Sequence, residues 1–306
     1  MDFTQLRYFY EVTRAGTIRD ACRQLNVAAS AVSRQIQLLE QQVGMPLFER
    51  HPRGMRLTEA GKIYAQHVKL VMLDEERTRS ELAALMGLEQ GSVRLAAVEG
   101  LVGDYITDAM GGFRTQHPGI AFDLHVTGTD DVVAAVRSGE ADIGLAFNAK
   151  PEREVEFRFR LVDQLNVFCA PDHPLAQKAS VSLREVLSHP VAVPITGFGI
   201  RAMIDECCRI EGLRLKPALL TNSIDALRAF AKAGLGLSMN SLRSCQREVA
   251  TGHLRAIPLA DRALQSASMD VMVLAGRKLP VAVEAFLAQL HRSAEAQGAA
   301  FVEQQP

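Results

Sequence analysis

The chain has 306 residues, of which 48% are hydrophobic and 23% charged, an ordinary composition for a globular protein of two or three domains. The net charge is −1, so the composition as a whole gives no sign of nucleic-acid binding. No stretch reaches the roughly eighteen consecutive apolar residues of a membrane span, which argues against a membrane partner.

The first residues and the cysteines indicate the compartment. The polar start after Asp2 lacks the basic and apolar regions of a signal peptide. The chain has five Cys residues, an odd number, and they show no zinc-ligand spacing. This pattern suits reduced thiols. We therefore expect a cytoplasmic protein without a metal or other cofactor.

Residues 1–58 differ in charge from the rest of the chain. They hold eight Arg and no Lys against five Asp and Glu, which gives +3 and leaves −4 for the remainder. A positive N-terminal part is what electrostatic attraction to DNA requires.

The N-terminal stretch predicts three short helices around one small core. Phe3 and Phe9 place apolar groups on the inner side of the first helix. The run from Thr17 to Val43 then reads as two helices around a tight turn. Thr17 is the predicted N-cap of the first, and Asn26 closes it, because Asn tolerates the left-handed conformation.

The second helix of this pair starts near Ala28 and has two unlike faces. One carries an apolar stripe. The other face of its first two turns shows only small or hydrogen-bonding side chains, namely Ala29, Ser30, Ser33, Arg34 and Gln37. Such groups approach base edges without a clash, as in the recognition helix of a helix-turn-helix, which lies in the major groove. Most short amphipathic helix pairs bind no DNA, so this stretch alone leaves a purely structural role open.

A basic hairpin is predicted next. Pro52 and Gly54 mark a tight turn within the sequence HPRGMRLTEAG. Arg50, Arg53 and Arg56 surround that turn. Their position after the recognition helix indicates the wing of a winged helix-turn-helix, where they would meet phosphates or a minor groove.

The run from Phe3 to Gly61, with VSRQIQLLE, VG, PLFER and R-LTEAG in this order, resembles the N-terminal domain of LysR-type transcriptional regulators. The resemblance implies a regulator that binds double-stranded operator DNA, and it leaves RNA polymerase open as a further partner. One departure matters. Many members carry Gln and Pro where this chain has Ala29 and Ser30, so we expect its operator to differ from the family's common half-site.

A long helix is predicted from Thr58 to about Gly87, because Thr58 is a good N-cap and the next proline is Pro118. A heptad seam runs along it, interrupted by Glu75 and Thr78. Its apolar members are Tyr64, Val68, Val71, Leu82 and Leu85. The preferred interpretation, which the resemblance also implies, is a dimerisation helix in a homodimer or homotetramer. The alternative is a helix packed on its own domain.

From Ser92 onward, short apolar strands alternate with helices, as in an α/β protein. The expected strands are 93–98, 120–126, 142–147, 165–170, 190–195, 217–221, 236–239 and 269–275. The expected helices are 103–116, 130–138, 182–188, 199–211, 223–233 and 280–296. The polar tail from Gln297 is expected to fray.

The fold class expected is an N-terminal all-α winged helix-turn-helix domain, a long linker helix and a two-lobed α/β effector domain. By the family resemblance, the effector domain is built like a type 2 periplasmic binding protein and can move about a hinge. The expected domains are 1–58, 59–90 and 91–296, with a tail at 297–306. Within the third, lobe one is about 92–162 and 267–296, and lobe two is about 163–266.

Ligands of open α/β sheets bind at the carboxyl ends of the strands. The residues that follow the expected strands give these candidates for effector binding: Glu99, Gly100, Thr127, Thr129, Phe147, Asn148, Thr196, Phe198, Arg201 and Asn222. Free N–H groups at helix N-termini and Thr hydroxyls suit a carboxylate or a similar oxygen group. Glu99 would repel a carboxylate unless Arg201 or another cation neutralises it, so the identity of the small-molecule effector stays open. The plainer alternative is that these turns only connect strands to helices.

Two other functions are weighed against a regulator. An enzyme or a solute-binding protein with an N-terminal appendage is disfavoured, because the chain has no catalytic or nucleotide-binding motif and no signal sequence. The glycine-rich segment 234–241 has Leu and Met where phosphate contacts need space, so a buried strand edge is expected there. A redox-sensing regulator of the same family would use Cys207 and Cys208. Adjacent Cys residues on a helix point about 100° apart and do not readily form a disulfide, so burial as small apolar groups is the alternative.

Overall fold

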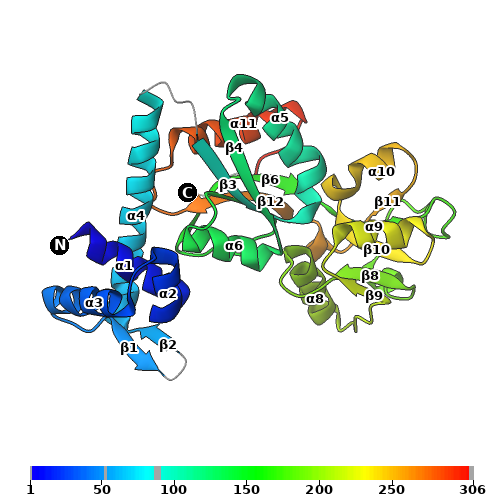
Figure 1. Ribbon diagram of the computed structural model, residues 1–306. Helices are drawn as coiled ribbons and strands as arrows, with labels where there is room; N and C mark the ends of the chain where they lie inside the picture. The colour runs from blue at the N-terminus through cyan, green and yellow to red at the C-terminus, as the bar shows by residue number, and fades with distance from the viewer. Residues whose placement is uncertain (1, 52–53, 86–90, 303–306) are drawn as a thin grey trace. The chain divides into compact units, whose positions relative to one another are not determined.

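The computed structural model describes residues 2–51, 54–85 and 91–302 (Figure 1). The chain divides into two compact units, Met1–Leu82 and Ala83–Pro306. The first contains the helix-turn-helix and the wing, and the second contains two α/β sheets, so the predicted fold class is confirmed.

Three helices open the first unit: α1 (Phe3–Ala15), α2 (Ile18–Leu25) and α3 (Ala29–Val43). The hydroxyl of Thr17 accepts a hydrogen bond from the amide of Asp20 at 3.0 Å and caps the start of α2. Asn26 ends the same helix in the left-handed conformation, with φ of 53°. Both predicted caps of α2 are confirmed.

The wing is an antiparallel hairpin of β1 (Phe48–His51) and β2 (Gly54–Leu57). Its first strand is tied to α3 by Glu40. The Glu40 carboxylate accepts hydrogen bonds from the amides of Leu47 at 2.7 Å and Phe48 at 3.0 Å. The position of the wing relative to α3 is therefore fixed by a side chain of α3 itself.

The second strand of the wing is tied to the turn between α1 and α2. The amide of Met55 donates to the carbonyl of Gly16 at 2.8 Å. A Cβ at Gly54 would stand 2.4 Å from the same Gly16 oxygen, and Gly54 has φ of +133°. Only glycine fits this close approach, so the turn that the sequence predicts at Gly54 also docks the wing on the helices.

Helix α4 (Glu59–Leu85) follows the wing. The hydroxyl of Thr58 accepts from the amide of Gly61 at 2.9 Å, which confirms the predicted N-cap. The first turns of α4 cover the core of the three-helix unit. Buried members of that core are Leu6, Phe9, Val12, Ala21, Leu25, Val32, Ile36, Leu39, Leu47, Phe48 and Val68.

The burial of Val68 in α4 corrects one member of the predicted dimer seam. Val68 is fully buried in the core of its own domain, and Val71 packs against that core. The ring of Tyr64 meets Phe9 edge-on, with centroids 5.3 Å apart. Val68 follows the alternative interpretation, because a core of three short helices needs a further apolar surface to cover it, whereas Tyr64 and Val71 are only partly buried. Leu82 is exposed, and the side chain of Leu85 lies outside the described residues.

Two five-stranded sheets make up the second unit. The first, with the helices that pack on it, is called lobe one and has the strand order β4-β3-β5-β12-β6. Strands β3, β4 and β5 run parallel, and β12 is antiparallel to both of its neighbours. The strands are β3 (Gly91–Ala97), β4 (Ile120–Val126), β5 (Ile143–Phe147), β6 (Val155–Asp163) and β12 (Ala267–Leu274).

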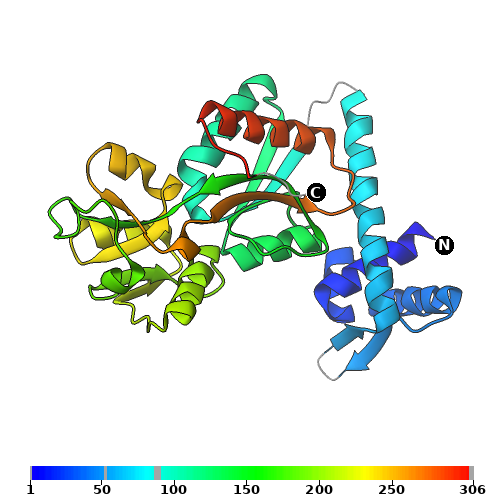
Figure 2. The same ribbon diagram turned by 180° about the vertical axis from the view of Figure 1, so that it is seen from behind.

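Helices cover both faces of the lobe-one sheet (Figures 1 and 2). Helices α5 (Thr107–Gln116) and α11 (Val281–Ala296) lie together on one face, where the rings of Phe113 and Phe286 meet with centroids 5.3 Å apart. Helix α6 (Thr129–Ser138) packs on the other face, against β5 and β12.

The second sheet, with its helices, is called lobe two and has the order β11-β7-β10-β8-β9. Its middle strand, β10, is wholly buried, which confirms the strand expected at 236–239 and places it at the centre of the sheet. The other strands are β7 (Leu165–Cys169), β8 (Val191–Pro194), β9 (Leu219–Thr221) and β11 (Arg255–Pro258), beside β10 (Leu237–Ser241). The helices are α7 (Leu183–Val186), α8 (Gly199–Glu211), α9 (Ile224–Lys232) and α10 (Gln246–Ala250).

The chain crosses between the sheets twice, from β6 to β7 and from β11 to β12. The C-terminal tail corrects another expectation. The amide of Val162 donates to the carbonyl of Ala300 at 2.7 Å, and the amide of Val302 donates to that of Arg160 at 2.8 Å. The tail therefore pairs with β6 as far as Val302 instead of fraying, because β6 offers an open edge of the sheet.

Candidate functional site

The outer face of α3 presents the predicted base-reading residues. Ala29, Ser30, Arg34 and Gln37 are exposed, and Ser33 is half-buried. Among the described residues, Arg34 has no hydrogen-bond or ion-pair partner, so its guanidinium is free to reach an external acceptor. Ala28 places no side-chain cap on α3, and the first turn has no acidic residue. The start of α3 is therefore open to a negatively charged partner.

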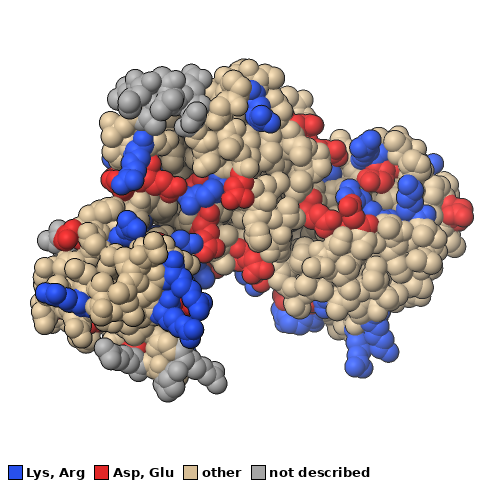
Figure 3. Space-filling view, in the orientation of Figure 1, with Lys and Arg blue, Asp and Glu red and all other residues tan. Residues whose placement is uncertain are grey.

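The wing adds a basic contribution beside α3. Arg56 on β2 is exposed, whereas Arg53 and the side chain of Arg50 lie outside the described residues. Figure 3 shows basic side chains gathered over α2, where Arg19 and Arg23 are exposed. Sequence reasoning missed Glu40, which holds the wing against α3. Its signal was a lone acidic group in a helix followed by the extended run PLFER.

A cavity of about 190 Å³ lies between the two lobes. It opens where strands of both sheets end and helices begin, as the sequence predicts for an effector site. Five of the predicted residues line it: Glu99, Thr127, Thr196, Phe198 and Asn222. The rest of its wall is Val126, Gly128, Asp131, Ile195 and Gly197.

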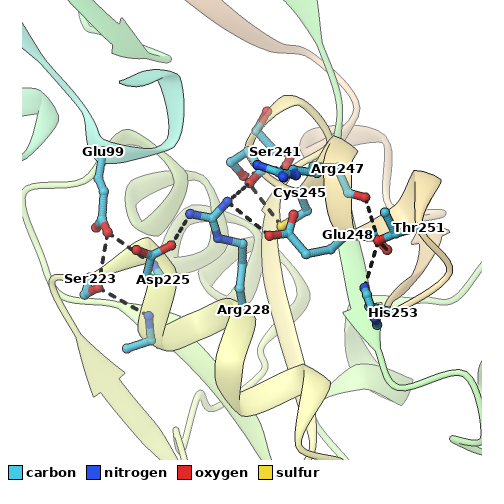
Figure 4. A network of polar contacts seen from close by, with 12 residues as sticks. Glu99, Ser223, Asp225, Arg228, Ser241, Cys245, Arg247, Glu248, Thr251 and His253 are labelled. Atoms are coloured by element: carbon cyan, nitrogen blue, oxygen red, sulfur yellow. Dashed lines mark hydrogen bonds and ion pairs between the residues drawn. The ribbon is translucent and has the colours of Figure 1, made fainter. Parts of the chain in front are cut away.

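The side chain of Glu99 binds the start of α9 in lobe two (Figure 4). Its carboxylate accepts from the amide of Ile224 at 2.6 Å and from that of Asp225 at 3.3 Å. It also accepts from the hydroxyl of Ser223 at 3.3 Å. The N–H groups at the start of α9 therefore hold this charged carboxylate in place.

Arg201, the cation expected to neutralise Glu99, is used elsewhere. Its Nε donates to the carboxylate of Asp205 at 2.9 Å, and its Nη1 donates to the carbonyl of Pro194 at 3.0 Å. Arg201 is not among the residues that line the cavity. The i,i+4 spacing of Arg201 and Asp205 on α8 was the signal for this pairing.

Thr129 also proves to be a lobe-to-lobe contact rather than a cavity wall. Its hydroxyl oxygen accepts from the amide of Gly199 at 3.0 Å and donates to the carbonyl of Phe147 at 3.3 Å. It is buried, with 3% of its surface exposed. Thr129 of α6 thus provides an acceptor for the first amide of α8 in the other lobe.

Three more predicted residues stand next to the cavity but not on its wall. Phe147 is buried, and its carbonyl would lie 1.9 Å from a Cβ at Gly199. Gly100 allows the turn after β3 to approach Ser244, whose Cβ would stand 2.8 Å from an added Cβ. Asn148 holds a left-handed backbone with φ of 49°. Close packing between the lobes explains these positions, because it needs a residue without a side chain at Gly100 and a strained backbone at Asn148.

A larger cavity, of about 490 Å³, lies beside the β6–β7 crossing and the C-terminal tail. None of the predicted effector residues lines it. Its polar wall includes Asp163, Arg243 and Gln297, and no helix of eight or more residues starts there among the described elements.

The cysteines give no support to redox chemistry. Cys207 and Cys208 are buried and form no disulfide. Burial raises the pKa of the Cys207 thiol to about 11 and also raises that of Cys208. A thiol with a raised pKa is scarcely ionised at neutral pH and is a poor nucleophile.

Two further features of the described residues bear on function. No group of three or more His, Cys, Asp and Glu side chains in this part of the chain is placed to hold a metal ion. None of the described helices combines the length and the apolar character needed to span a lipid bilayer.

Comparisons with known proteins match both units. Residues 3–62 match the family model described as "Bacterial regulatory helix-turn-helix protein, lysR family", and residues 86–295 match "LysR substrate binding domain". An uncharacterized HTH-type transcriptional regulator of Bacillus subtilis, YybE, is 30% identical over 78% of this chain and 82% of its own.

Solved structures share the fold. Full-length OxyR of Pseudomonas aeruginosa, in a variant form, is similar with a TM-score of 0.74 at 18% identity, covering 100% of this chain and 99% of that one. Full-length CbnR in complex with its target DNA has a TM-score of 0.56 at 20% identity, covering 96% of this chain and 100% of that one.

Proposed function

The chain belongs to the LysR family of bacterial transcriptional regulators, and we propose that α3 with the wing reads its operator while the cavity between the lobes binds its effector. It is a DNA-binding regulator with an effector-binding domain and not an enzyme. The observation that carries the proposal for the effector is that side chains from both lobes line one cavity.

The proposed operator contacts divide by chemistry. Arg34 would read a base, because an exposed Arg near the start of a recognition helix can contact guanine through two hydrogen bonds. Ser30, Ser33 and Gln37 would add polar contacts, and Ala29 an apolar one to a thymine methyl. Arg50, Arg53 and Arg56 on the wing would contact phosphates, which position the protein without reading sequence.

A second copy of this chain would supply the second helix-turn-helix. Because Val68 is used in the core of its own domain, the contact between copies falls on the exposed apolar residues of α4. Ile63 on that helix is 74% exposed and Leu82 is 56% exposed. Large apolar groups in such positions favour contact with another protein surface.

The proposed switch is a change in the arrangement of the lobes. An effector in the cavity would touch Thr127 and Asp131 of lobe one and Thr196 and Asn222 of lobe two. It can shift the lobes only if it binds one arrangement better than the other. DNA affinity would change through the coupling of the two units within the dimer.

A dose–response curve at a target promoter tests the cavity. Candidate effectors are compounds taken from the reactions of enzymes encoded beside the gene. Thr196→Val keeps the shape of the side chain and deletes its hydroxyl, so half-maximal response should need about two- to tenfold more effector. Thr115→Val, at an exposed hydroxyl on α5, is the matched control. If the curve is unchanged in Thr196→Val and also in a second variant, Asn222→Ala, the effector binds elsewhere.

A further inference from the structure

We infer that Glu99 decides which class of effector the cavity between the lobes accepts: a small cationic molecule such as an amine, and not a carboxylate. This inference rests on the proposed role of that cavity as the effector site. It reverses the expectation from sequence, where open helix N-termini favoured a carboxylate guest.

The start of α9 has no amide left for an incoming anion. The amides of Ile224 and Asp225 donate to Glu99, and the amide of Ala226 donates to the hydroxyl of Ser223 at 3.2 Å. Glu99 therefore occupies the position that a ligand carboxylate would need at this helix.

The other two helices that begin at the cavity each have one first-turn amide engaged by the opposite lobe. The first amide of α8, at Gly199, donates to Thr129. The amide of Asp130 in the first turn of α6 donates to the carbonyl of Gly197 at 3.1 Å. In each case the acceptor comes from the opposite lobe, so a contact between the lobes takes up one N–H group at the start of each of these helices.

The charge of the wall has one sign. Glu99 and Asp131 are carboxylates, and none of the lining residues is Lys, Arg or His. The nearby cation of lobe two, Arg228, is paired with Asp225 and Glu248 and donates to the carbonyl of Ser244 (Figure 4). A carboxylate placed here would meet like charge, whereas an ammonium group would meet opposite charge.

The remaining groups complete the description of the ligand. Thr127 already donates its hydroxyl hydrogen to Asp131 at 3.2 Å, so this pair offers acceptors to the cavity. Val126 and Ile195 present exposed apolar surface on the two sides. A molecule that fits about 190 Å³ and matches both kinds of group is a short alkyl chain that ends in an ammonium group. The chain would contact the apolar surface, and the ammonium group would donate to the acceptors.

Propylammonium and propionate are matched probes of similar size and opposite charge. Each is titrated against the full-length protein at constant ionic strength, with binding followed by calorimetry and by the midpoint of thermal unfolding. The wild type should bind propylammonium saturably and at least about tenfold more tightly than propionate, since one like charge replaced by an opposite one changes affinity by that order.

Substitution of Glu99 should reverse this preference. Glu99→Ala frees the amides of α9 and should create a saturable propionate site, while it weakens propylammonium. Glu99→Gln keeps the size of the side chain and should reduce the preference for the cation, which then rests on Asp131 alone, without opening a propionate site. Glu206→Gln, at an exposed ion pair on α8, is the control and should behave as the wild type.

Three results would overturn the inference: wild-type binding of propionate as tight as that of propylammonium, no saturable binding of propylammonium, or no gain of propionate binding in Glu99→Ala. If Glu99→Ala fails to fold, the reduction of cation preference in Glu99→Gln decides. Should the probes behave as expected while Thr196→Val leaves the transcriptional response unchanged, the ligand class stands and the effector role of the cavity fails.

Discussion

Thr129 of α6 and Gly199 of α8 are joined across the two lobes by a hydrogen bond of 3.0 Å, from the Gly199 amide to the Thr129 hydroxyl. The same hydroxyl donates to the carbonyl of Phe147, so one buried group serves two backbone partners. Thr129 therefore links the lobes directly, and the link can be removed by a single substitution.

Thr129→Val should destabilise the effector domain. The change keeps the side-chain shape but leaves a buried amide and a buried carbonyl without this partner, which costs about 1–3 kcal/mol of unfolding free energy. Urea unfolding of the full-length protein measures the change. Thr115→Val, at an exposed hydroxyl, should change stability by less than about 0.5 kcal/mol. Equal stability of the two variants would show that the Thr129 bond contributes nothing.

Asp142 should make lobe one sensitive to acid. Its carboxylate binds Arg94 at 2.7 Å and Arg277 at 2.7 Å, and both Asp142 and Arg277 are almost wholly buried. Burial alone raises the pKa of Asp142. The hydrogen bonds and charges of the two arginines lower it by more than burial raises it, so the net pKa is below the ordinary 3.8. A lowered pKa in the folded state contributes stability above the unfolded value, and this contribution is lost as pH falls through the folded value.

The measurement is unfolding free energy from pH 7 down to about 2. The wild type should lose stability below about pH 4, the region between the unfolded and folded pKa of Asp142. Asp142→Asn should be less stable at pH 7 by about 3–5 kcal/mol, because Arg277 is left buried without its carboxylate. Its stability should also depend less on pH in the acid range. A pH dependence identical to that of the wild type would contradict the assignment.

Much of the N-terminal unit could be predicted because its signals are local. The caps of α2 lie within four residues of the groups they bind, and Gly54 marks its turn directly in the sequence. The long strand β6 was missed although VEFRFRL alternates between apolar and charged residues, because these charged residues concealed a strand at the edge of the sheet. Its Arg160 pairs with the buried Asp270, which no local pattern reveals.

The site was harder to predict than the fold. Strand ends identified the right edge of each sheet, and Glu99, Thr127, Thr196, Phe198 and Asn222 do meet at one cavity. What each side chain does there depends on partners far away in sequence. Thr129 and Gly199 are separated by 70 residues, and Glu99 and Ile224 by 125. Only the closed packing of the lobes determines that these groups bind each other.

The exposed face of α4 should hold two copies of the chain together. Ile63→Asp places a charge on a 74% exposed position, so the folded monomer should keep its stability to within about 0.5 kcal/mol. The dimer should be lost, because the charge would be buried without a partner in the contact. Light scattering measures the mass, and Ile210→Asp on α8, at a 58% exposed position, is the control. A dimeric Ile63→Asp protein would show that the copies meet elsewhere.

Arg56 on the wing should act through phosphates. Arg56→Ala is expected to weaken specific and random duplexes by similar factors and to reduce the slope of log affinity against log salt by about one unit. The titration is repeated at several salt concentrations, with Arg114→Ala as a control at an exposed Arg on α5. If the slope of Arg56→Ala equals that of the wild type, the wing does not touch the DNA backbone.

The most direct test is fluorescence anisotropy of the full-length protein on labelled operator DNA and on a scrambled duplex at one fixed salt concentration. Arg34→Ala should lose about 1–3 kcal/mol of binding on the operator and much less on the scrambled duplex, since a base contact is lost only where the base is present. Arg114→Ala should match the wild type on both. Operator affinity unchanged by Arg34→Ala, or an equal loss on the two duplexes, would contradict the claim that the exposed face of α3 reads the sequence.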